Sequence, residues 1–419
     1  MNSDIYQLIK KSKTDFVQVN FADAVTKRIS FEKQEVKDFS KTSAESVSVS
    51  VWIGKKQGVV TSTKFSKELL DRAIRVAKSS EDLEFFYGIP SIKKASKGRK
   101  LYFGEKSEDE IFDSAKCLIP LLKKNESVSK AEIEYSTFTR KIINSEGTDL
   151  EEKGSLFGAS VEDLIKDKEP ITYIDTLSSR DFPSKKEISK FSNAVINETR
   201  ELRHPLKLKK IPKDIILSYD ALSKLIQSGF ISNFNGMNVL KKRSCLGDSQ
   251  GRKLFSEKFN LIDSGVLERG VESQCFDDEG SPSRENVLIK KGVVGDFIYD
   301  YNTAKHLGKT STGNSLGGGI GFNNLIIKKG KGINLDNCLI VKDILGAHTC
   351  NETTTEFSVK SFGTLLVENG KKMAVKDVMI QGRVLNILKK IVAVGNKVKN
   401  VGGYYVPEIA FNGIHVESM

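Results

Sequence analysis

Three adjacent carboxylates, Asp277, Asp278 and Glu279, precede a Gly280-Ser-Pro turn about two-thirds of the way along this 419-residue chain. Neighbouring carboxyl groups can act as an acid/base pair or bind a hard metal ion. The same residues can also be a solvated cap of a turn, or they can attract the positively charged ends of peptides. The residue types leave the structural and the functional interpretation open.

A glycine-rich segment, Ser311–Gly319, follows this acidic turn, and glycines allow a second backbone to come close. Residues 286–301 lie between the two and contain an apolar run, a turn at Lys291-Gly292 and an alternating stretch, which predicts a β-hairpin. Peptide or partner binding, as one of these two open interpretations, is assigned to both ends of this hairpin. The assigned residues are Asp277, Asp278, Glu279, Gly280, Ser311, Thr312, Gly313 and Asn314.

His348 and Cys350 are two residues apart and would face the same side of a strand, as metal ligands do. A zinc site needs three or four ligands, and nothing in the spacing requires Glu352 or His306 to complete one. A buried cysteine beside a structural histidine is the simpler interpretation. We expect no catalytic residue, cofactor or metal in this chain, with His348 and Cys350 as a residual candidate pair.

The four histidines, at 204, 306, 348 and 415, are too far apart in sequence to form the His-Glu-x-x-His helix of zinc proteases. The five cysteines form no Cys-x-x-Cys pair, which favours reduced thiols. No apolar run is long enough to cross a membrane, and the N-terminus does not read as a signal peptide. We expect a cytoplasmic protein without membrane contact.

The formal net charge is +12, which would suit a nucleic-acid partner. The lysines, however, are spread along the chain and interleaved with acids, and there is no arginine-rich or aromatic-basic stripe. Nucleic-acid association therefore remains an alternative and not the expectation.

Alternating polar and apolar residues predict strands at 15–21, 28–32 and 46–53, and Ser66, Ser107 and Ser184 each begin a predicted helix. A basic, proline-bracketed stretch at 204–212 predicts a linker. Beyond the linker only 220–232 and 384–393 are predicted to be helical. The expected fold class is α+β. The expected parts are an N-terminal sheet-and-helix part, 1–203, with sublayers 1–92 and 101–203, and a β-rich C-terminal domain, 213–419.

Several of these segments resemble the TldD/TldE (PmbA) family, whose members have also been called modulators of DNA gyrase. The run Phe276–Pro282, then Thr303-Ala304, Leu307-Gly308 and Ser311–Asn314, is similar to the family's central signature. Residues 49–62, 144–147, 346–349, 356–358, 366–370 and 375–382 resemble further family segments.

The resemblance implies one of two branches. TldD-type members carry a zinc-protease-like helix, and TldE (PmbA)-type members lack it. Alignment of the family's serine after that helix with Ser244 places the motif positions near Gln227, Ser228 and Ser232, none of which is a histidine or a glutamate. The chain is therefore identified with the TldE type.

The expected function is that of a non-catalytic subunit in a heterodimeric metalloprotease that trims or degrades unfolded or precursor peptides. This subunit would shape the channel and cavity through which peptides enter, and zinc would belong to the TldD-type partner. In isolation the subunit could form a homodimer. An autonomous metal-dependent peptidase with a degenerate His348/Cys350 site is the alternative, so whether the chain is itself an enzyme stays open.

Overall fold

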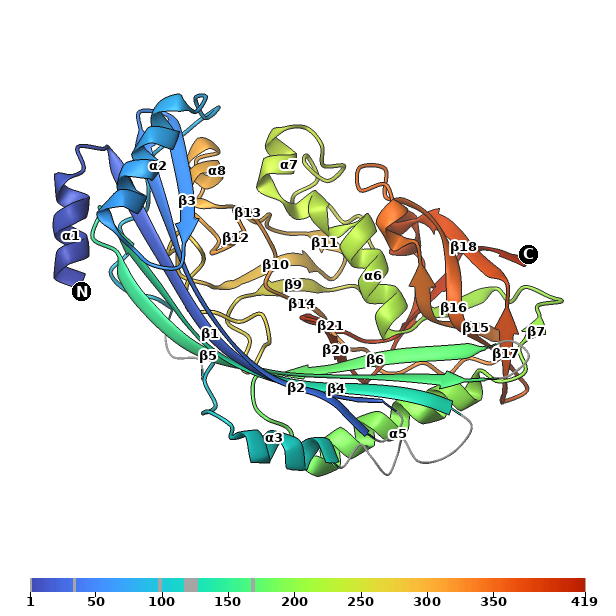
Figure 1. Cartoon of the computed structure of the whole chain (residues 1–419). Helices are drawn as coiled ribbons and strands as arrows, with labels where there is room; N and C mark the ends of the chain where they lie inside the picture. The colour runs from blue at the N-terminus through green and yellow to red at the C-terminus, as the bar shows by residue number, and fades with distance from the viewer. Residues whose placement is uncertain (1, 33–34, 97–99, 117–126, 167–169, 419) are drawn as a thin grey trace.

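The structure, a computed structural model, describes residues 2–32, 35–96, 100–116, 127–166 and 170–418 (Figure 1). The N-terminal part contains α1 (Asn2–Lys11), β1 (Phe16–Glu32), β2 (Glu35–Ile53), β3 (Lys56–Ser62), α2 (Lys67–Ser79), α3 (Glu108–Ala115), β4 (Ser127–Asn144), β5 (Asp149–Ile165), β6 (Ile171–Ser179) and α5 (Lys185–Glu201). The expected α+β class is confirmed, with a β-rich C-terminal part.

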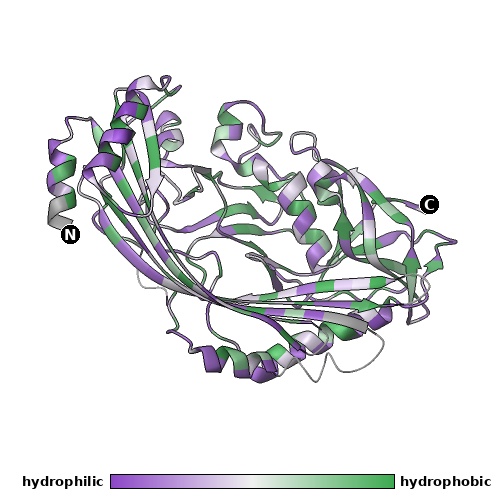
Figure 2. Ribbon diagram, viewed as in Figure 1, coloured by the Kyte–Doolittle hydropathy of each residue, from purple (hydrophilic) through white to green (hydrophobic). Residues whose placement is uncertain are grey.

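The N-terminal strands form one six-stranded antiparallel sheet in the order β3-β2-β1-β4-β5-β6. Its long strands alternate between hydrophilic and hydrophobic residues, as Figure 2 shows. The prediction of separate strands at 15–21 and 28–32 is wrong, because β1 continues through residues 22–27. Both neighbours, β2 and β4, pair with this stretch and satisfy its backbone hydrogen-bonding groups.

The buried residues of β1 lie on one face of the strand and pack against different helices at its two ends. Val17 and Val19 share a buried cluster with residues of α1 and α2, whereas Ile29 and Phe31, of the same parity, share one with residues of α3 and α5. The four helices described for this part therefore cover one face of the curved sheet, and the C-terminal part lies on the other (Figure 1). The predicted N-terminal caps stabilise the first turns of three helices. The Ser66 hydroxyl accepts the N–H of Leu69 in α2, and α3 and α5 each begin with a capping box.

The C-terminal part contains two larger sheets and several short helices. Its first elements are β7 (Leu206–Lys207), β8 (Asp214–Leu217), α6 (Tyr219–Gly229), η2 (Ile231–Phe234), α7 (Gly236–Leu240), β9 (Leu261–Ser264), β10 (Glu285–Lys290), β11 (Val293–Val294), α8 (Tyr301–His306), β12 (Ser315–Leu316), β13 (Gly319–Ile320) and β14 (Asn324–Ile327). It ends with β15 (Cys338–Leu345), η3 (Ala347–Thr349), β16 (Glu356–Glu368), β17 (Lys371–Lys376), β18 (Val378–Arg383), α9 (Val384–Ile387), β19 (Ile391–Val394), β20 (Lys399–Val401), β21 (Tyr404–Val406), β22 (Ile409–Asn412) and β23 (His415–Ser418).

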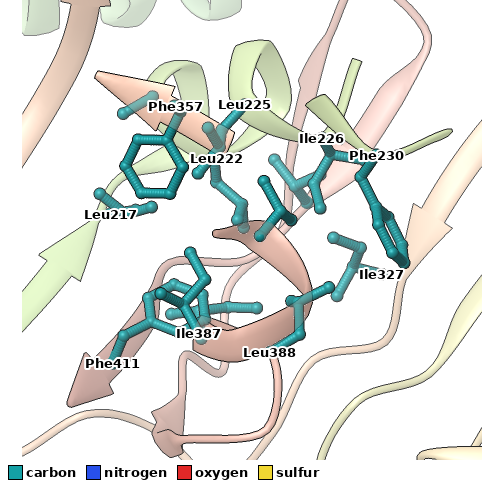
Figure 3. Close-up of a cluster of buried hydrophobic side chains, with 14 of the residues drawn as sticks. Leu217, Leu222, Leu225, Ile226, Phe230, Ile327, Phe357, Ile387, Leu388 and Phe411 are labelled. Atoms are coloured by element: carbon teal, nitrogen blue, oxygen red, sulfur yellow. The ribbon is translucent and has the colours of Figure 1, made fainter. Parts of the chain in front are cut away.

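One sheet runs β19-β22-β8-β15-β16-β17-β7, with β18 paired to β16 and β23 paired to β18. The other runs β11-β10-β9-β14-β21-β20. Helix α6 lies in the core of this part. Figure 3 shows Leu222, Leu225 and Ile226 of α6 together with Ile387 and Leu388, all of which belong to one buried cluster. The predicted helix at 220–232 is confirmed as α6, and η2 continues from it.

The helix predicted at 384–393 is wrong in extent, because α9 ends at Ile387 and residues 391–394 form β19. The Ile391–Val394 segment pairs with β22, so its hydrogen bonds are made across a sheet. The helix predicted to begin at Ser107 is α3, which is described up to Ala115, and residues 117–126 lie outside the described part of the chain. No helix within the described ranges is both long and apolar enough to cross a membrane.

The predicted linker 204–212 contains β7, which pairs in parallel with β17. On either side of it the two parts share buried contacts, since Leu365 and Ala374 join the cluster that contains Ile133 and Val195. The two sublayers share one sheet, because β1 pairs with β4 from Gln18–Asn144 to Glu32–Lys130.

Candidate functional site

A pocket of about 690 Å³ lies where the sheet face opposite the helices meets the acidic turn of the C-terminal part. Gln18 and Asn20 of β1, and Ser46, Ser48 and Ser50 of β2, line it from the sheet. Asp277, Asp278, Glu279 and Asp300 line it from the other side. The volume is that of a site for a small molecule or a few residues of peptide.

The predicted hairpin that follows the acidic turn is present but short. Strand β10 pairs with β11 through Ile289–Val294 and Lys290–Val293, and Lys291 and Gly292 form the turn with positive φ. The chain after β11 leads to α8, and Asp300 at the start of this helix lines the same pocket as the acidic turn.

Asp277 is fully buried and organises the turn. Its Oδ1 accepts the N–H groups of Glu279 and Ser281, at 3.0 and 2.8 Å, and its Oδ2 accepts that of Ser315 at 3.0 Å. Burial raises the pKa of Asp277, against the effect of these three hydrogen bonds. The contacts of Asp277 therefore favour a structural role, in which its carboxylate holds the turn together.

Asp278 connects the turn to the N-terminal sheet. Its Oδ1 lies 3.1 Å from Arg140 of β4, its Oδ2 accepts the N–H of Gly317, and its carbonyl accepts from the amides of Gln18 and Asn20. The Arg140 guanidinium also donates to Gln274 and lies 3.4 Å from the buried Glu152. This network fixes the wall of the pocket at the boundary between the two parts.

Glu279 faces Asp300 at the start of α8. Glu279 Oε2 accepts the N–H of Tyr301, and Asp300 Oδ1 caps α8 by accepting the N–H of Thr303. Burial, with the nearby Asp277 and Asp300 carboxylates, raises the pKa of Glu279 well above its ordinary value. Within the described residues, no lysine or arginine forms an ion pair with Glu279 or Asp300.

The four residues Ser311–Asn314 do not line the pocket. Thr312 and Asn314 are buried, and Asn314 donates to Asp263 Oδ2 at 2.9 Å and to the Gly321 carbonyl. Gly313 has a φ of +71°, and a side chain there would meet the Pro282 carbonyl. Three other residues of the glycine-rich segment, Ser315, Gly318 and Gly319, do line the pocket. Gly280 lies in the acidic turn and has a φ of +86°.

The expectation that His348 and Cys350 share a strand face is wrong, because the segment is the 3-10 helix η3. His348 is exposed, whereas Cys350 is buried near Gly229 at the end of α6, and burial raises the pKa of its thiol. A protonated, buried thiol and an exposed imidazole do not fit a shared zinc ion. In the part of the chain that the structure describes, no three His, Cys, Asp or Glu side chains are grouped to hold a metal.

Sequence reasoning missed Gln18, Asn20, Trp52, Phe86 and Asp300, all of which line the pocket. The signal for Gln18 and Asn20 was the polar alternation of β1, which marks a face turned away from the helices. Phe86 is stacked on Trp52 with ring centroids 5.5 Å apart, a contact between a loop and a strand that spacing does not encode.

Comparisons with known proteins agree with this architecture. Residues 212–418 match the family model described as the PmbA/TldA metallopeptidase C-terminal domain. An uncharacterized protein of Methanocaldococcus jannaschii is 25% identical over 98% of this chain and 99% of its own length. A metalloprotease PmbA homolog of Haemophilus influenzae is 23% identical over 90% of this chain and 87% of its own length. The crystal structure of TldE from Thermococcus kodakarensis superposes with a TM-score of 0.92 at 22% identity, covering 99% of both chains.

The family model relates residues 212–418 to a metallopeptidase C-terminal domain, and the solved structure of TldE has the same fold over the whole chain. The chain belongs to the PmbA/TldD family.

Proposed function

We propose that this chain is a non-catalytic, TldE/PmbA-type subunit that assembles with a TldD-type metalloprotease and shapes the cavity in which peptides are trimmed or degraded. The proposal places the heterodimer in the cytoplasm, where the free thiols of Cys245, Cys275, Cys338 and Cys350 would stay reduced.

The observation that carries the proposal lies at the end of α6 and in η2. Gln227 is exposed there, and Ser228 and Ser232 are partly buried, at the positions that the resemblance assigns to the protease motif. Amide and hydroxyl side chains replace the two imidazoles and the carboxylate that a catalytic zinc helix requires. We therefore propose that the catalytic zinc of the assembly is bound by the TldD-type partner.

The pocket supports a role in holding peptide. Strand β3 is the outer strand of the sheet, and Gln57 and Val59 on it line the pocket. Within the described residues, the outer backbone edge of β3 is paired only at its start, by a bridge from Lys56 to Asp82 and a hydrogen bond from the Leu83 N–H to the Lys55 carbonyl. An extended peptide can add to such an edge through backbone hydrogen bonds, which suits substrates of varied sequence.

An autonomous peptidase is the alternative, and one contact favours it: Cys350 lies beside the end of α6, close to Gly229. Its buried thiol would have to lose a proton to become a ligand. Direct assay of the isolated chain separates the two functions.

Coexpression with a TldD-type protein from the same genome tests the proposed assembly. We expect a stable heterodimer by size-exclusion chromatography with light scattering, and peptide cleavage that requires both chains. Ser48→Arg fills the pocket from β2 and should reduce cleavage without preventing assembly, whereas Ser43→Arg, on the same strand but outside the pocket, should not. Failure to form any complex, or equal cleavage by both variants, contradicts the proposal.

A further inference from the structure

Glu279 and Asp300 form no ion pair within the described residues, although three cations, Arg140, Lys141 and Lys241, also line the pocket. Lys141 pairs with Asp149. Asp278 is paired with Arg140, and Glu84 lies 3.8 Å from Lys241 on the opposite wall. Glu279 and Asp300 instead face each other, and each uses one oxygen to accept a backbone N–H. Two neighbouring carboxylates without a counter-ion favour a positively charged ligand between them.

Gln18 supplies an independent observation on the sheet side of the pocket. Gln18 is only 6% exposed. Its Nε2 donates to the Asp278 carbonyl at 2.8 Å and to Asn20 Oδ1 at 3.2 Å. Its Oε1 is buried and has no hydrogen-bond donor in the described part of the chain. A buried acceptor of this kind is unfavourable until a donor arrives from outside.

Trp52, Phe85 and Phe86 line the pocket, and further aromatic rings pack against them. Trp52 and Phe86 are stacked with an interplanar angle of 5°, and Phe16 meets Phe86 edge-on. Phe85 lies against His306, whose Nδ1 is 3.0 Å from the Tyr87 hydroxyl. The faces of aromatic rings attract ammonium groups, and they also pack against the apolar groups that such ammonium groups carry.

From these three features we infer that the pocket is a binding site for a primary ammonium group joined to an apolar or aromatic group, as presented by the unblocked N-terminus of a peptide with a hydrophobic first residue. Glu279 and Asp300 supply the negative charge, Gln18 Oε1 accepts one N–H of the ammonium, and Trp52 and Phe86 contact the apolar group. The choice of a peptide end rests on the proposed function, whereas the cation site belongs to this chain alone.

The cation site also accounts for the electrostatics of Glu279. Burial and two neighbouring carboxylates favour its protonated form, and a bound ammonium opposes that effect. Selectivity should therefore be for charge, because acetylation removes the charge of the amine and two of its N–H donors while leaving the aromatic ring unchanged.

L-Phenylalaninamide is a suitable probe, because it has one ammonium, one ring and no carboxylate. Titration calorimetry with the isolated chain should show binding, and N-acetyl-L-phenylalaninamide should bind at least about tenfold more weakly. Glu279→Gln keeps an oxygen that can accept the N–H of Tyr301 and should weaken binding by a similar factor. Glu257→Gln, an exposed carboxylate outside the pocket, should leave binding unchanged.

Asp300→Asn is the second variant, since asparagine caps helices as well as aspartate does. It should fold, as judged by circular dichroism, and should also weaken binding of the probe. No binding by the wild-type chain, equal binding of the acetylated probe, or unchanged binding by both folded variants would overturn the inference. Each of these results would leave heterodimer formation and cleavage unaffected, so it is distinguishable from failure of the proposed function.

Discussion

The Arg140 guanidinium on β4 lies 3.1 Å from the Asp278 carboxylate, and this pair joins the N-terminal sheet to the acidic turn of the C-terminal part. Arg140 also lies 3.4 Å from Glu152, whose side chain is 3% exposed. Removal of the arginine would leave a buried carboxylate without its cation, which is more costly than the loss of a surface pair.

Arg140→Ala should therefore lower the free energy of unfolding by about 2–4 kcal/mol, measured by urea denaturation. Arg28→Ala is the matched control, because Arg28 on β1 pairs with Glu134 at the surface, and it should cost less than about 1 kcal/mol. Equal effects of the two changes would show that the Arg140 network does not hold the two parts together.

Asp277→Asn tests the structural interpretation of the turn. Asparagine has one side-chain oxygen, so it cannot accept the Glu279, Ser281 and Ser315 N–H groups from both sides. We expect destabilisation by about 1–3 kcal/mol in chemical denaturation. Asp296→Asn, at an exposed carboxylate that accepts from Gln250, should remain within about 0.5 kcal/mol of wild type. An Asp277→Asn protein as stable as wild type would return the residue to a purely functional role.

Stability should fall as pH rises from about 5 to 7. Burial is the first cause that raises the pKa of four carboxyl groups in the folded state: Asp175, Asp263, Asp277 and Glu279. Between their ordinary values, about 4, and the raised values the folded state binds more protons than the unfolded state, so the stabilisation is lost as pH rises through this window. Urea titrations at several pH values measure the slope, and Glu279→Gln should make it shallower. A free energy of unfolding that increases steadily from pH 5 to 7 would contradict this assignment.

The predicted boundary at 204–212 leads to a proteolysis experiment. Lys209 and Lys210 are exposed, Ile211 is 50% exposed, and this short stretch lies outside any strand or helix. Brief trypsin treatment should cut there early, and the two fragments should stay associated because they share the buried cluster around Ile133 and Leu365. If the first cuts fall within β8 or α6, the boundary is misplaced.

Local sequence signals predicted much of the fold because their causes are local. The alternation at 46–53 gave the buried face of β2, and the Ser184 and Glu187 pair forms the capping box of α5. The break predicted within β1 was wrong because residues 22–27 are held by β2 and β4 on both sides, which the segment itself does not reveal.

The site depended on contacts between distant segments. Gln18 donates to the carbonyl of Asp278, which lies 260 residues away in sequence. The buried carboxylate of Asp277 accepts one of its hydrogen bonds from Ser315, which lies 38 residues away in sequence. Composition marked the acidic turn, but it could not separate Asp277, which holds the turn, from Glu279, which faces the pocket. Ser311–Asn314 were assigned to binding from glycine content, whereas Asn314 makes buried hydrogen bonds to Asp263.

The most direct test of the central claim is peptidase activity of the isolated chain, purified without any TldD-type protein, together with its zinc content. We predict no chelator-sensitive cleavage of unfolded peptides and no stoichiometric zinc, with cleavage restored when the catalytic partner is added. Chelator-sensitive cleavage by the isolated chain that is lost in Cys350→Ala, accompanied by one bound zinc per chain, would contradict the account.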